Sequence, residues 1–374
     1  MTKMKFLLAI GIVGSLIFSG CFTDTDENNT TPKELELLWQ YAYNLDGGAP
    51  SAQPFIFDEM IITSGDINVT SNDYRTGQEI WKTPFDHHQQ LTSRNFGLID
   101  NVLVGNITRA ILAWDIVSGE NLWQLDFTEQ QSWSFRRGIE VANDKFILAS
   151  QGTPLYLFSN VGELKTELLD IRSYEATFKD NLVFIGQVKN SHGLVSAYDY
   201  PSFDLNWRFS PEGFGIPSRM APIVENNIVY IGTQGGPSGS QNGFFALDAH
   251  TGQEIWRQEG ILTFHAVLEG DYIYVNDGAG IYKLRKSDGH MVWYADFRAG
   301  AGTAPIAYGY GYIYAPHSGR MHIVNAETGE IVHRLDPPNG SFFWLVTAGK
   351  GRIFAQSNRH LYAFAPWGHT EPLE

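Results

Sequence analysis

The 374-residue sequence has one cysteine, few positive charges and no apolar run long enough to cross a bilayer. A single cysteine cannot form a disulfide within the chain, so a disulfide-stapled scaffold is excluded. Lysine and arginine number 26 against 41 aspartates and glutamates, which gives a formal net charge of −15. An acidic surface repels nucleic acid, and no basic cluster overrides it, so we expect no nucleic-acid partner.

Helical periodicity is also lacking. Between residues 35 and 367, no segment repeats its apolar residues at the spacing of an amphipathic helix. The chain instead carries short β-branched and aromatic runs, with 38 glycines and 14% aromatic residues. This composition is typical of an all-β protein with many short strands and tight turns.

One stretch, residues 221–256, shows the strand pattern most fully. Two β-branched runs, Ile223-Val224 and Ile228–Ile231, are separated by turn-forming asparagines. A third run, Phe244–Leu247, leads through an Asp-to-Gly turn into Ile255-Trp256. These four runs predict one antiparallel unit of four short strands.

The end of this unit recurs along the chain. An aspartate stands eight residues before a tryptophan and a glycine stands four before it, so that the aspartate can cap the turn and the glycine can adopt a positive φ. The full pattern occurs at Asp73/Gly77/Trp81, Asp115/Gly119/Trp123 and Asp248/Gly252/Trp256. We expect the six tryptophans in phase to be core residues: Trp39, Trp81, Trp123, Trp207, Trp256 and Trp293.

The repeat period is about 42 residues, which is the signature of a β-propeller. Seven units end near residues 81, 123, 166, 207, 256, 293 and 333, and the third and seventh lack the tryptophan. An eighth unit has only three strands, and residues 36–41 look like its missing fourth strand. The sequence predicts an eight-bladed propeller of four-stranded antiparallel blades, closed by the N-terminal strand. Seven blades is the alternative, if the third unit is not a blade.

The N-terminal segment looks like an export signal. Lys3 and Lys5 precede an apolar run, and Phe18-Ser19-Gly20-Cys21 resembles the bacterial lipobox, with Phe where Leu is usual. The resemblance implies that residues 1–20 are removed and that Cys21 is the lipid-attachment site. No aspartate follows Cys21, which by the same resemblance favours the outer membrane, on its periplasmic side or at the cell surface.

Three further segments complete the expected domain organisation. Residues 21–34 are rich in Thr, Asp, Glu and Asn and read as a flexible acidic tether. Residues 35–367 form the propeller as one domain, and residues 368–374 form a C-terminal tail. We expect a monomer held at the membrane by its lipid.

Two copies of the repeat resemble a known superfamily closely. Ala246-Leu-Asp248-x-x-Thr251-Gly252-x-x-x-Trp256 is similar to the repeat of pyrroloquinoline-quinone-type propellers, and residues 113–123 match it as well. That superfamily contains quinone-dependent dehydrogenases and cofactor-free envelope lipoproteins of outer-membrane protein assembly. The size, the lipobox and the single domain resemble the second group.

Catalytic features are scarce. The quinone enzymes place two adjacent cysteines beside the cofactor, whereas Cys21 is the only cysteine here, and no clustered Glu, Asn and Asp set marks a Ca²⁺ site. His87-His88 has no third ligand at metal spacing, and we expect exposed loop histidines. Gly232–Gly243 lacks the Gly-Lys-Ser/Thr ending of a phosphate loop, and we expect a hairpin insertion. The sequence therefore predicts no enzyme, no cofactor and no metal.

Four tryptophans are out of phase with the repeat. We expect burial for all of them, with an exposed binding platform for Trp133 and Trp344 as the alternative; the four are Trp114, Trp133, Trp344 and Trp367. The functional hypothesis is a non-catalytic, lipid-anchored scaffold that binds envelope proteins, with a role in outer-membrane protein assembly as its specific form. The alternatives are a quinone-dependent dehydrogenase and a binding module for a carbohydrate or another small ligand.

Overall fold

The computed structural model describes most of the chain from residue 34 onwards. The described ranges are 34–43, 52–65, 67–84, 91, 95–107, 110–126, 138–148, 153–173, 175–189, 192–217, 220–235, 240–298, 302–339 and 341–373. Every regular element in these ranges is a β-strand. A search of the same ranges for a helix with the length and apolarity of a membrane span finds none.

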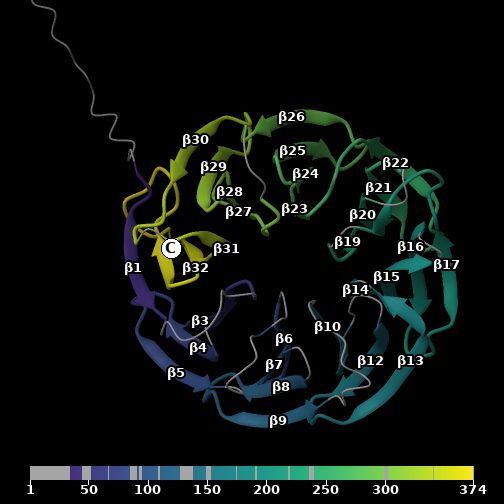
Figure 1. The fold of residues 1–374 in the computed structure, drawn as a ribbon, viewed down its shortest axis with the longest axis horizontal. Coiled ribbons are helices and arrows are strands. Elements are labelled where there is room, and N and C mark those ends of the chain that lie inside the picture. Colours follow the sequence, from purple (N-terminus) through teal and green to yellow (C-terminus); the bar gives the residue numbers. More distant parts are fainter. Residues whose placement is uncertain are drawn as a thin grey trace, which may run out of the picture. The chain divides into compact units, whose positions relative to one another are not determined.

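The strands form eight sheets that stand around a common axis, as in a propeller (Figure 1). Their bounds are as follows.

The first blade contains β2 (Phe55–Phe57), β3 (Met60–Gly65), β4 (Asn68–Asp73) and β5 (Glu79–Pro84). The second contains β6 (Gly97–Ile99), β7 (Val102–Asn106), β8 (Ala110–Asp115) and β9 (Asn121–Asp126). The third contains β10 (Ile139–Ala142), β11 (Lys145–Leu148), β12 (Thr153–Ser159) and β13 (Leu164–Ser173). The fourth contains β14 (Glu175–Lys179), β15 (Leu182–Lys189), β16 (His192–Asp199) and β17 (Leu205–Phe209).

The fifth contains β18 (Ile216–Pro217), β19 (Ile223–Glu225), β20 (Ile228–Gln234), β21 (Gly243–Asp248) and β22 (Glu254–Glu259). The sixth contains β23 (His265–Glu269), β24 (Tyr272–Asn276), β25 (Gly280–Arg285) and β26 (Met291–Asp296). The seventh contains β27 (Ala307–Gly309), β28 (Tyr312–His317), β29 (Arg320–Asn325) and β30 (Ile331–Leu335). The eighth contains β31 (Phe343–Gly349), β32 (Arg352–Ser357), β33 (His360–Phe364) and β1 (Leu37–Ala42).

The middle strands of each blade form the core. All six residues of β3 are buried, as are the first five of β8. Both faces of a middle strand pack against neighbouring blades, so these strands are nearly continuous runs of apolar and small residues. The outermost strand alternates instead, because only one of its faces is covered; in β5, Trp81 is buried between exposed and half-buried neighbours.

The ring closes through the two ends of the chain, as predicted. β1 pairs antiparallel with β33, and in Figure 1 the purple β1 lies at the outer edge of the yellow blade. The Ala365 N–H donates to the Glu36 carbonyl at 2.9 Å, as the Asp73 N–H donates to the Gln78 carbonyl at 2.8 Å within the first blade. Residues 36 and 365 therefore meet at the position of an ordinary turn, and β33 is covered by β1 on its outer side.

The third unit is a complete blade, because β10 to β13 form a four-stranded sheet without a tryptophan. Eight blades are thus confirmed in the described part of the chain, and the seven-bladed alternative is wrong.

The fifth blade carries one strand more than expected. β18 pairs with the end of β20, with Ile216 opposite Gln234. The approach is close: a Cβ added to Gly215 would lie 1.7 Å from the Gly235 carbonyl oxygen. The glycine-rich insertion after β20 thus borders an added strand, and only a glycine fits at this contact.

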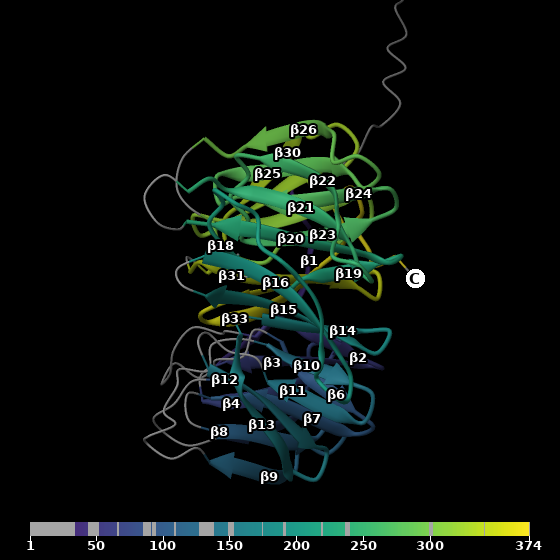
Figure 2. The ribbon, with the colours of Figure 1, turned by 90° about the vertical axis from the view of Figure 1, so that its right-hand side faces the viewer.

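Consecutive strands within a blade are antiparallel, so the connections alternate between two faces of the ring. We call the lower face the one that carries the Asp-to-Gly turns and the tight turns between first and second strands. The upper face carries the chain segments that lead from one blade into the innermost strand of the next. Figure 2 shows the ring from its side, with the strands running between these two faces.

Candidate functional site

The repeat residues meet at the contacts between blades. Trp81 is 8% exposed, and its Nε1–H donates to the Ile116 carbonyl at 3.1 Å. Its ring covers Gly119 of the next blade so closely that a Cβ there would lie 2.5 Å from a ring carbon. Gly119 also has a φ of 75°, so the turn and the ring both demand glycine.

The same tryptophan–glycine contact joins five further pairs of blades: Trp39 with Gly77, Trp123 with Gly162, Trp207 with Gly252, Trp256 with Gly289, and Trp293 with Gly329. Trp207 and Trp256 are buried, whereas Trp39, Trp123 and Trp293 are half-buried. The contact is therefore a latch between neighbouring blades, placed toward the outer rim of the ring.

Two contacts, between the third and fourth blades and between the seventh and eighth, have no such tryptophan–glycine pair in the described part of the chain. In both, another residue stands at the tryptophan position. The third blade has Thr166 opposite Leu157, where other blades place the tryptophan. The following turn carries Phe203 in place of glycine, with a φ of 59°. No tryptophan of the described residues covers this turn, so a side chain is accommodated. In the seventh blade, His333 replaces the tryptophan and stacks on Trp367 at 4.8 Å between ring centroids.

A buried lysine modifies one latch. Lys283 is 5% exposed, and its ammonium donates to the Ala326 carbonyl at 2.8 Å. That carbonyl corresponds to the Ile116 carbonyl that receives the Trp81 indole. Trp293 donates instead to the next carbonyl, of Glu327, at 3.0 Å. The ammonium of Lys283 thus donates to the carbonyl that in other blades accepts from the tryptophan indole. This hydrogen bond compensates the burial of the ammonium.

The turn aspartates act on their own backbone. Asp248 Oδ1 accepts from the Thr251 N–H at 2.7 Å, the Thr251 hydroxyl at 2.8 Å and the His250 N–H at 3.0 Å. Asp115 and Asp73 make the equivalent contacts. The hydrogen bonds from Thr251 lower the pKa of Asp248, which keeps the cap ionised at neutral pH. These repeat residues therefore stabilise the turns and the contacts between blades.

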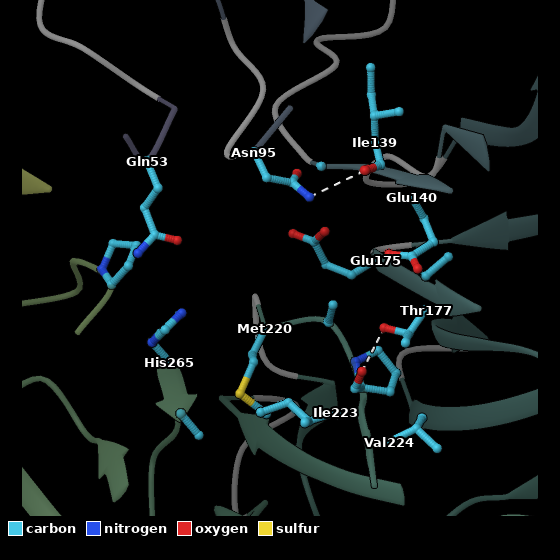
Figure 3. A pocket seen from close by; sticks show the side chains of 16 residues that line it. Gln53, Asn95, Ile139, Glu140, Glu175, Thr177, Met220, Ile223, Val224 and His265 are labelled. Carbon is cyan, nitrogen blue, oxygen red and sulfur yellow. Dashed lines mark hydrogen bonds between the residues drawn. The ribbon is translucent and has the colours of Figure 1, made fainter. Parts of the chain in front are cut away.

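The candidate ligand site is a cavity of about 390 Å³ at the upper mouth of the axial channel. It is lined by residues at or just before the innermost strands of seven blades, so it exists only because the ring closes. Its polar side contains Gln53, Asn95, Glu175 and His265, drawn in Figure 3.

Hydrogen bonds fix most of these polar side chains. Gln53 Nε2 donates to the Val346 carbonyl at 3.0 Å, and Asn95 Nδ2 donates to the Ile139 carbonyl at 3.2 Å. His265 Nδ1 accepts from the Ile306 N–H at 3.2 Å. Because the side-chain amide nitrogens of Gln53 and Asn95 donate to backbone carbonyls, these two side chains are held in place at the cavity wall.

Two glutamates, Glu140 and Glu175, are among the described residues that line the cavity. Glu175 is 5% exposed, and its carboxylate points into the cavity (Figure 3). Glu140 Oε1 accepts from the Phe178 N–H at 3.2 Å. Burial, together with the nearby charge of Glu175, raises the pKa of Glu140 to about 7. No lysine or arginine is among the 16 described residues that line the cavity.

A quinone cofactor does not fit this donor set. Pyrroloquinoline quinone is a polycarboxylate, and the carboxylates of Glu140 and Glu175 among the described lining residues would repel it. Within the described residues, no group of three His, Cys, Asp or Glu side chains stands ready to hold a metal ion. The described lining residues therefore offer neither a matching charge for the quinone nor a group of metal ligands.

The other residues singled out in the sequence have different fates. Cys21, His87-His88 and Trp133 lie outside the described residues. Trp114 and Trp367 are buried, as expected. Trp344 is 45% exposed, so the expectation of burial is wrong for it. The register shifts between Phe343 and Leu345, which makes Trp344 the extra residue of a bulge and turns its ring outward.

Sequence reasoning missed the axial cavity. Glu175 and His265 begin innermost strands, but nothing distinguishes them from other polar residues near strand ends. A usable signal is the position itself, because seven blades contribute residues at or just before the start of their innermost strand.

Comparison with known proteins agrees with the fold. A family model described as outer membrane protein assembly factor BamB matches residues 63–263 and 242–350. BamB of Yersinia pestis is 24% identical over 324 residues, which cover 79% of each chain. BamB of Legionella pneumophila (strain Paris) is 26% identical over 189 residues, 48% of this chain and 47% of the relative, so the chain spans about half the length of that relative.

Solved structures show the same architecture. The crystal structure of BamB from Moraxella catarrhalis is similar with a TM-score of 0.68 and 16% identity, covering 89% of this chain and 100% of that one. The computationally designed Ika8 protein reaches a TM-score of 0.69, with the same identity and coverage. At this identity the likeness concerns the fold alone. The family model, however, matches more than half of the sequence, and the chain therefore belongs to the family described as outer membrane protein assembly factor BamB.

Proposed function

We propose that the protein is a non-catalytic, lipid-anchored propeller that binds other envelope proteins during assembly of outer-membrane proteins. The observation that carries this proposal is the family match across residues 63–350 on a closed eight-bladed ring. The relatives are described as outer membrane protein assembly factors, and we extend that role to this chain. The repeat residues support a scaffold, since they serve turns and blade contacts.

The upper face offers a contact for a partner protein. Phe342 is 59% exposed and Trp344 is 45% exposed, at the start of the innermost strand of the eighth blade. Phe342 covers Gly319, where a Cβ would lie 2.1 Å from its ring, so its position is constrained. Constrained aromatic side chains bury a large area at little entropic cost and commonly dominate protein interfaces. We propose that this aromatic pair anchors an assembly partner.

The N-terminal region completes the proposal. Residues 1–20 act as the export signal, Cys21 carries the lipid, and residues 21–34 tether the ring to the membrane. The lipobox-like sequence supports this arrangement, which places the ring at the outer membrane, on its periplasmic side or at the cell surface.

Crosslinking in intact cells tests the role. The protein, tagged at its C-terminus, is crosslinked, solubilised and recovered, and barrel-assembly subunits are expected to come with it. Trp344→Ala is expected to lower their recovery, whereas Val117→Ala, at a 56% exposed apolar residue on the lower face, is expected to leave it unchanged. If wild-type protein recovers no assembly subunit, the proposal is wrong. If Trp344→Ala recovers as much as wild type, the contact lies elsewhere.

A further inference from the structure

We infer that a cluster of three basic side chains on the lower face, where the eighth blade meets the first, binds a phosphate group. The cluster consists of Arg75, Lys350 and Arg352, gathered around the ring of Tyr74. This site goes beyond the proposed function, because a protein-binding scaffold does not require an anion site. The sequence does not reveal the cluster, since its members lie near opposite ends of the chain.

Tyr74 is the centre of the cluster and is held firmly. Its side chain is 8% exposed and belongs to the same core cluster as Ile61 and Phe354. The Tyr74 N–H donates to the Glu59 carbonyl at 3.1 Å, and the Tyr74 carbonyl accepts from the Trp39 indole at 3.1 Å. The ring is therefore fixed in place between the first and eighth blades, which are neighbours in Figure 1.

Three cations surround this ring. The guanidinium carbon of Arg75 lies 4.8 Å from the ring centroid, that of Arg352 lies 5.0 Å away, and the Lys350 ammonium lies 5.7 Å away. Arg352 Nη1 also donates to the Lys350 carbonyl at 2.9 Å, within the turn that joins β31 to β32. Each contact has the geometry of a cation–π interaction. Three positive groups thus converge on one fixed point of the lower face.

The neighbouring carboxylates balance this charge only in part. Glu59 forms an ion pair with Arg75 at 2.7 Å. The Asp73 carboxylate accepts from the N–H groups of Arg75 and Thr76 and so caps its own turn. Burial lowers the pKa of Arg352, and the charge of Arg75 contributes to this shift. Cations placed in this way repel one another, and an anion bound among them relieves that repulsion.

The chemistry of the cluster selects the anion. Arg75 and Lys350 are exposed and Arg352 is half-buried, so a ligand can approach from solvent. Guanidinium groups bind phosphate oxygens through paired donors, and an ammonium binds them as a point charge. A phosphomonoester offers three acceptor oxygens and about 1.5 to 2 negative charges, which suits three cations. A carboxylate brings two oxygens and a single charge, so it matches the cluster less well.

Two sources share this chemistry, namely a soluble phosphomonoester and the headgroup of a membrane lipid. The strand β1 enters the ring on the same lower face, where the Ala365 N–H donates to the Glu36 carbonyl. The lipid proposed on Cys21 would make a headgroup the nearer source. Only this choice between the sources rests on the proposed function.

Binding is measured on the chain from residue 21 with Cys21→Ser, so that no acyl chain contributes. Calorimetric titration with glycerol 3-phosphate is expected to show saturable 1:1 binding, whereas glycerol is expected not to bind and acetate to bind more weakly. Flotation with phosphatidylcholine vesicles that contain phosphatidic acid tests the headgroup, against vesicles of phosphatidylcholine alone. Physiological salt limits the repulsion from the acidic chain to about 8 Å. Flotation only with phosphatidic acid supports the lipid source, and titration without flotation supports the soluble one.

Charge-removing variants locate the site. Lys350→Gln and Arg352→Gln are each expected to weaken the binding of glycerol 3-phosphate about tenfold, since a charge-assisted contact becomes a neutral one. Lys179→Gln is the matched control, because it removes an exposed lysine beside the corresponding turn of the fourth blade, and it is expected to bind like the parent chain. Thermal unfolding checks each variant. Lys350 is exposed, so its variant keeps the test valid if Arg352→Gln does not fold.

No saturable binding in either arm, or unchanged binding by Lys350→Gln, would overturn the inference. Acetate that binds as tightly as glycerol 3-phosphate would overturn the assignment to phosphate. Leu373 donates to the Gly351 carbonyl at 3.1 Å, next to Lys350, and Glu374 after it lies outside the described residues. If binding appears only in a chain that ends at Leu373, the C-terminal carboxylates fill the site and the inference is wrong.

Recovery of assembly subunits in the crosslinking experiment is a separate readout. The failure of one proposal therefore leaves the other standing.

Discussion

A tryptophan in one blade and a glycine in the next constrain each other, although about 38 residues separate them in the case of Trp81 and Gly119. The ring covers the turn, and the turn carbonyl receives the indole N–H. Where Phe203 stands in the glycine position, the preceding blade has no tryptophan. The two positions thus form one unit of structure, and a change in either acts on the contact between blades.

Gly119→Ala tests the glycine half of this unit. The added Cβ meets the Trp81 ring at 2.5 Å and also suffers the positive φ of 75°. Gly213→Ala is the matched control, because Gly213 has a φ of 81° and nothing within 4 Å of its would-be Cβ. We expect the control to lose about 1 kcal/mol and Gly119→Ala clearly more, measured by urea unfolding. Equal losses in the two variants would mean that the Trp81 indole moves aside for the added methyl group at little cost.

Trp81→Ala tests the other half. Removing this 8% exposed side chain leaves a cavity between blades, and large-to-small changes of this kind cost about 3–5 kcal/mol. Trp344→Ala, at an exposed ring, is expected to change the stability by less than about 0.5 kcal/mol. A small effect of Trp81→Ala on the urea midpoint would contradict the role of the latch.

At the level of elements, the hairpin of β28 and β29 contains two buried histidines. His322 stacks on Phe297 at 4.4 Å between ring centroids, and His317 meets His322 edge-on at 5.4 Å. Burial, together with the neighbouring His317 and two arginines, lowers the pKa of His322 to about 4. Burial also lowers the pKa of His317. Both rings are therefore neutral in the folded protein at neutral pH.

This predicts a loss of stability in mild acid. The unfolded chain binds protons on histidine at a pKa near 6.5, so it binds more protons than the folded protein as the pH falls from about 6.5 toward 4. We expect the free energy of unfolding to drop by on the order of 1 kcal/mol across this window. His322→Gln is expected to flatten the dependence, and His250→Gln, at an exposed turn, to leave it unchanged. An identical pH profile for His322→Gln would contradict the prediction.

The strand β1 belongs to the eighth blade, although the next strand along the chain, β2, belongs to the first blade. β1 therefore links the two ends of the ring. Without it, β33 would be an open edge with unpaired backbone groups. A chain that begins at Tyr43 is expected to unfold at lower urea concentration and to self-associate in light scattering. A chain that begins at Glu34 keeps β1 and is expected to remain monomeric. A monomeric, equally stable shortened chain would contradict the closure argument.

At the scale of the whole molecule, the proposed anchor decides where the ring acts. Cys21→Ser removes the only thiol and is expected to move the protein from the membrane fraction to the soluble periplasmic fraction. Its urea midpoint is expected to equal that of the wild type, because the ring is unchanged. A Cys21→Ser protein that stays in the membrane pellet would show that another contact anchors it.

The sequence was sufficient to predict those parts of the fold that depend on residues close together in the chain. It predicted eight blades, the closure by residues 36–41 and the turn positions, because the Asp–Gly–Trp frame repeats within a short stretch. It missed β18, which pairs through a glycine contact specific to one blade, and it placed Trp344 inside, because a bulge cannot be read from alternation. The cavity was missed altogether, because Gln53, Glu175 and His265 lie in different repeats.

The sequence by itself determined the period, the turns and which tryptophans stand in phase, because turn hydrogen bonds depend on residue types at fixed spacing. Only the tertiary structure decided which polar residues face the axis and that two glutamates share one cavity there. The physical reason is ring closure. Residues from the starts of seven innermost strands converge at the channel mouth only when the whole circle is complete.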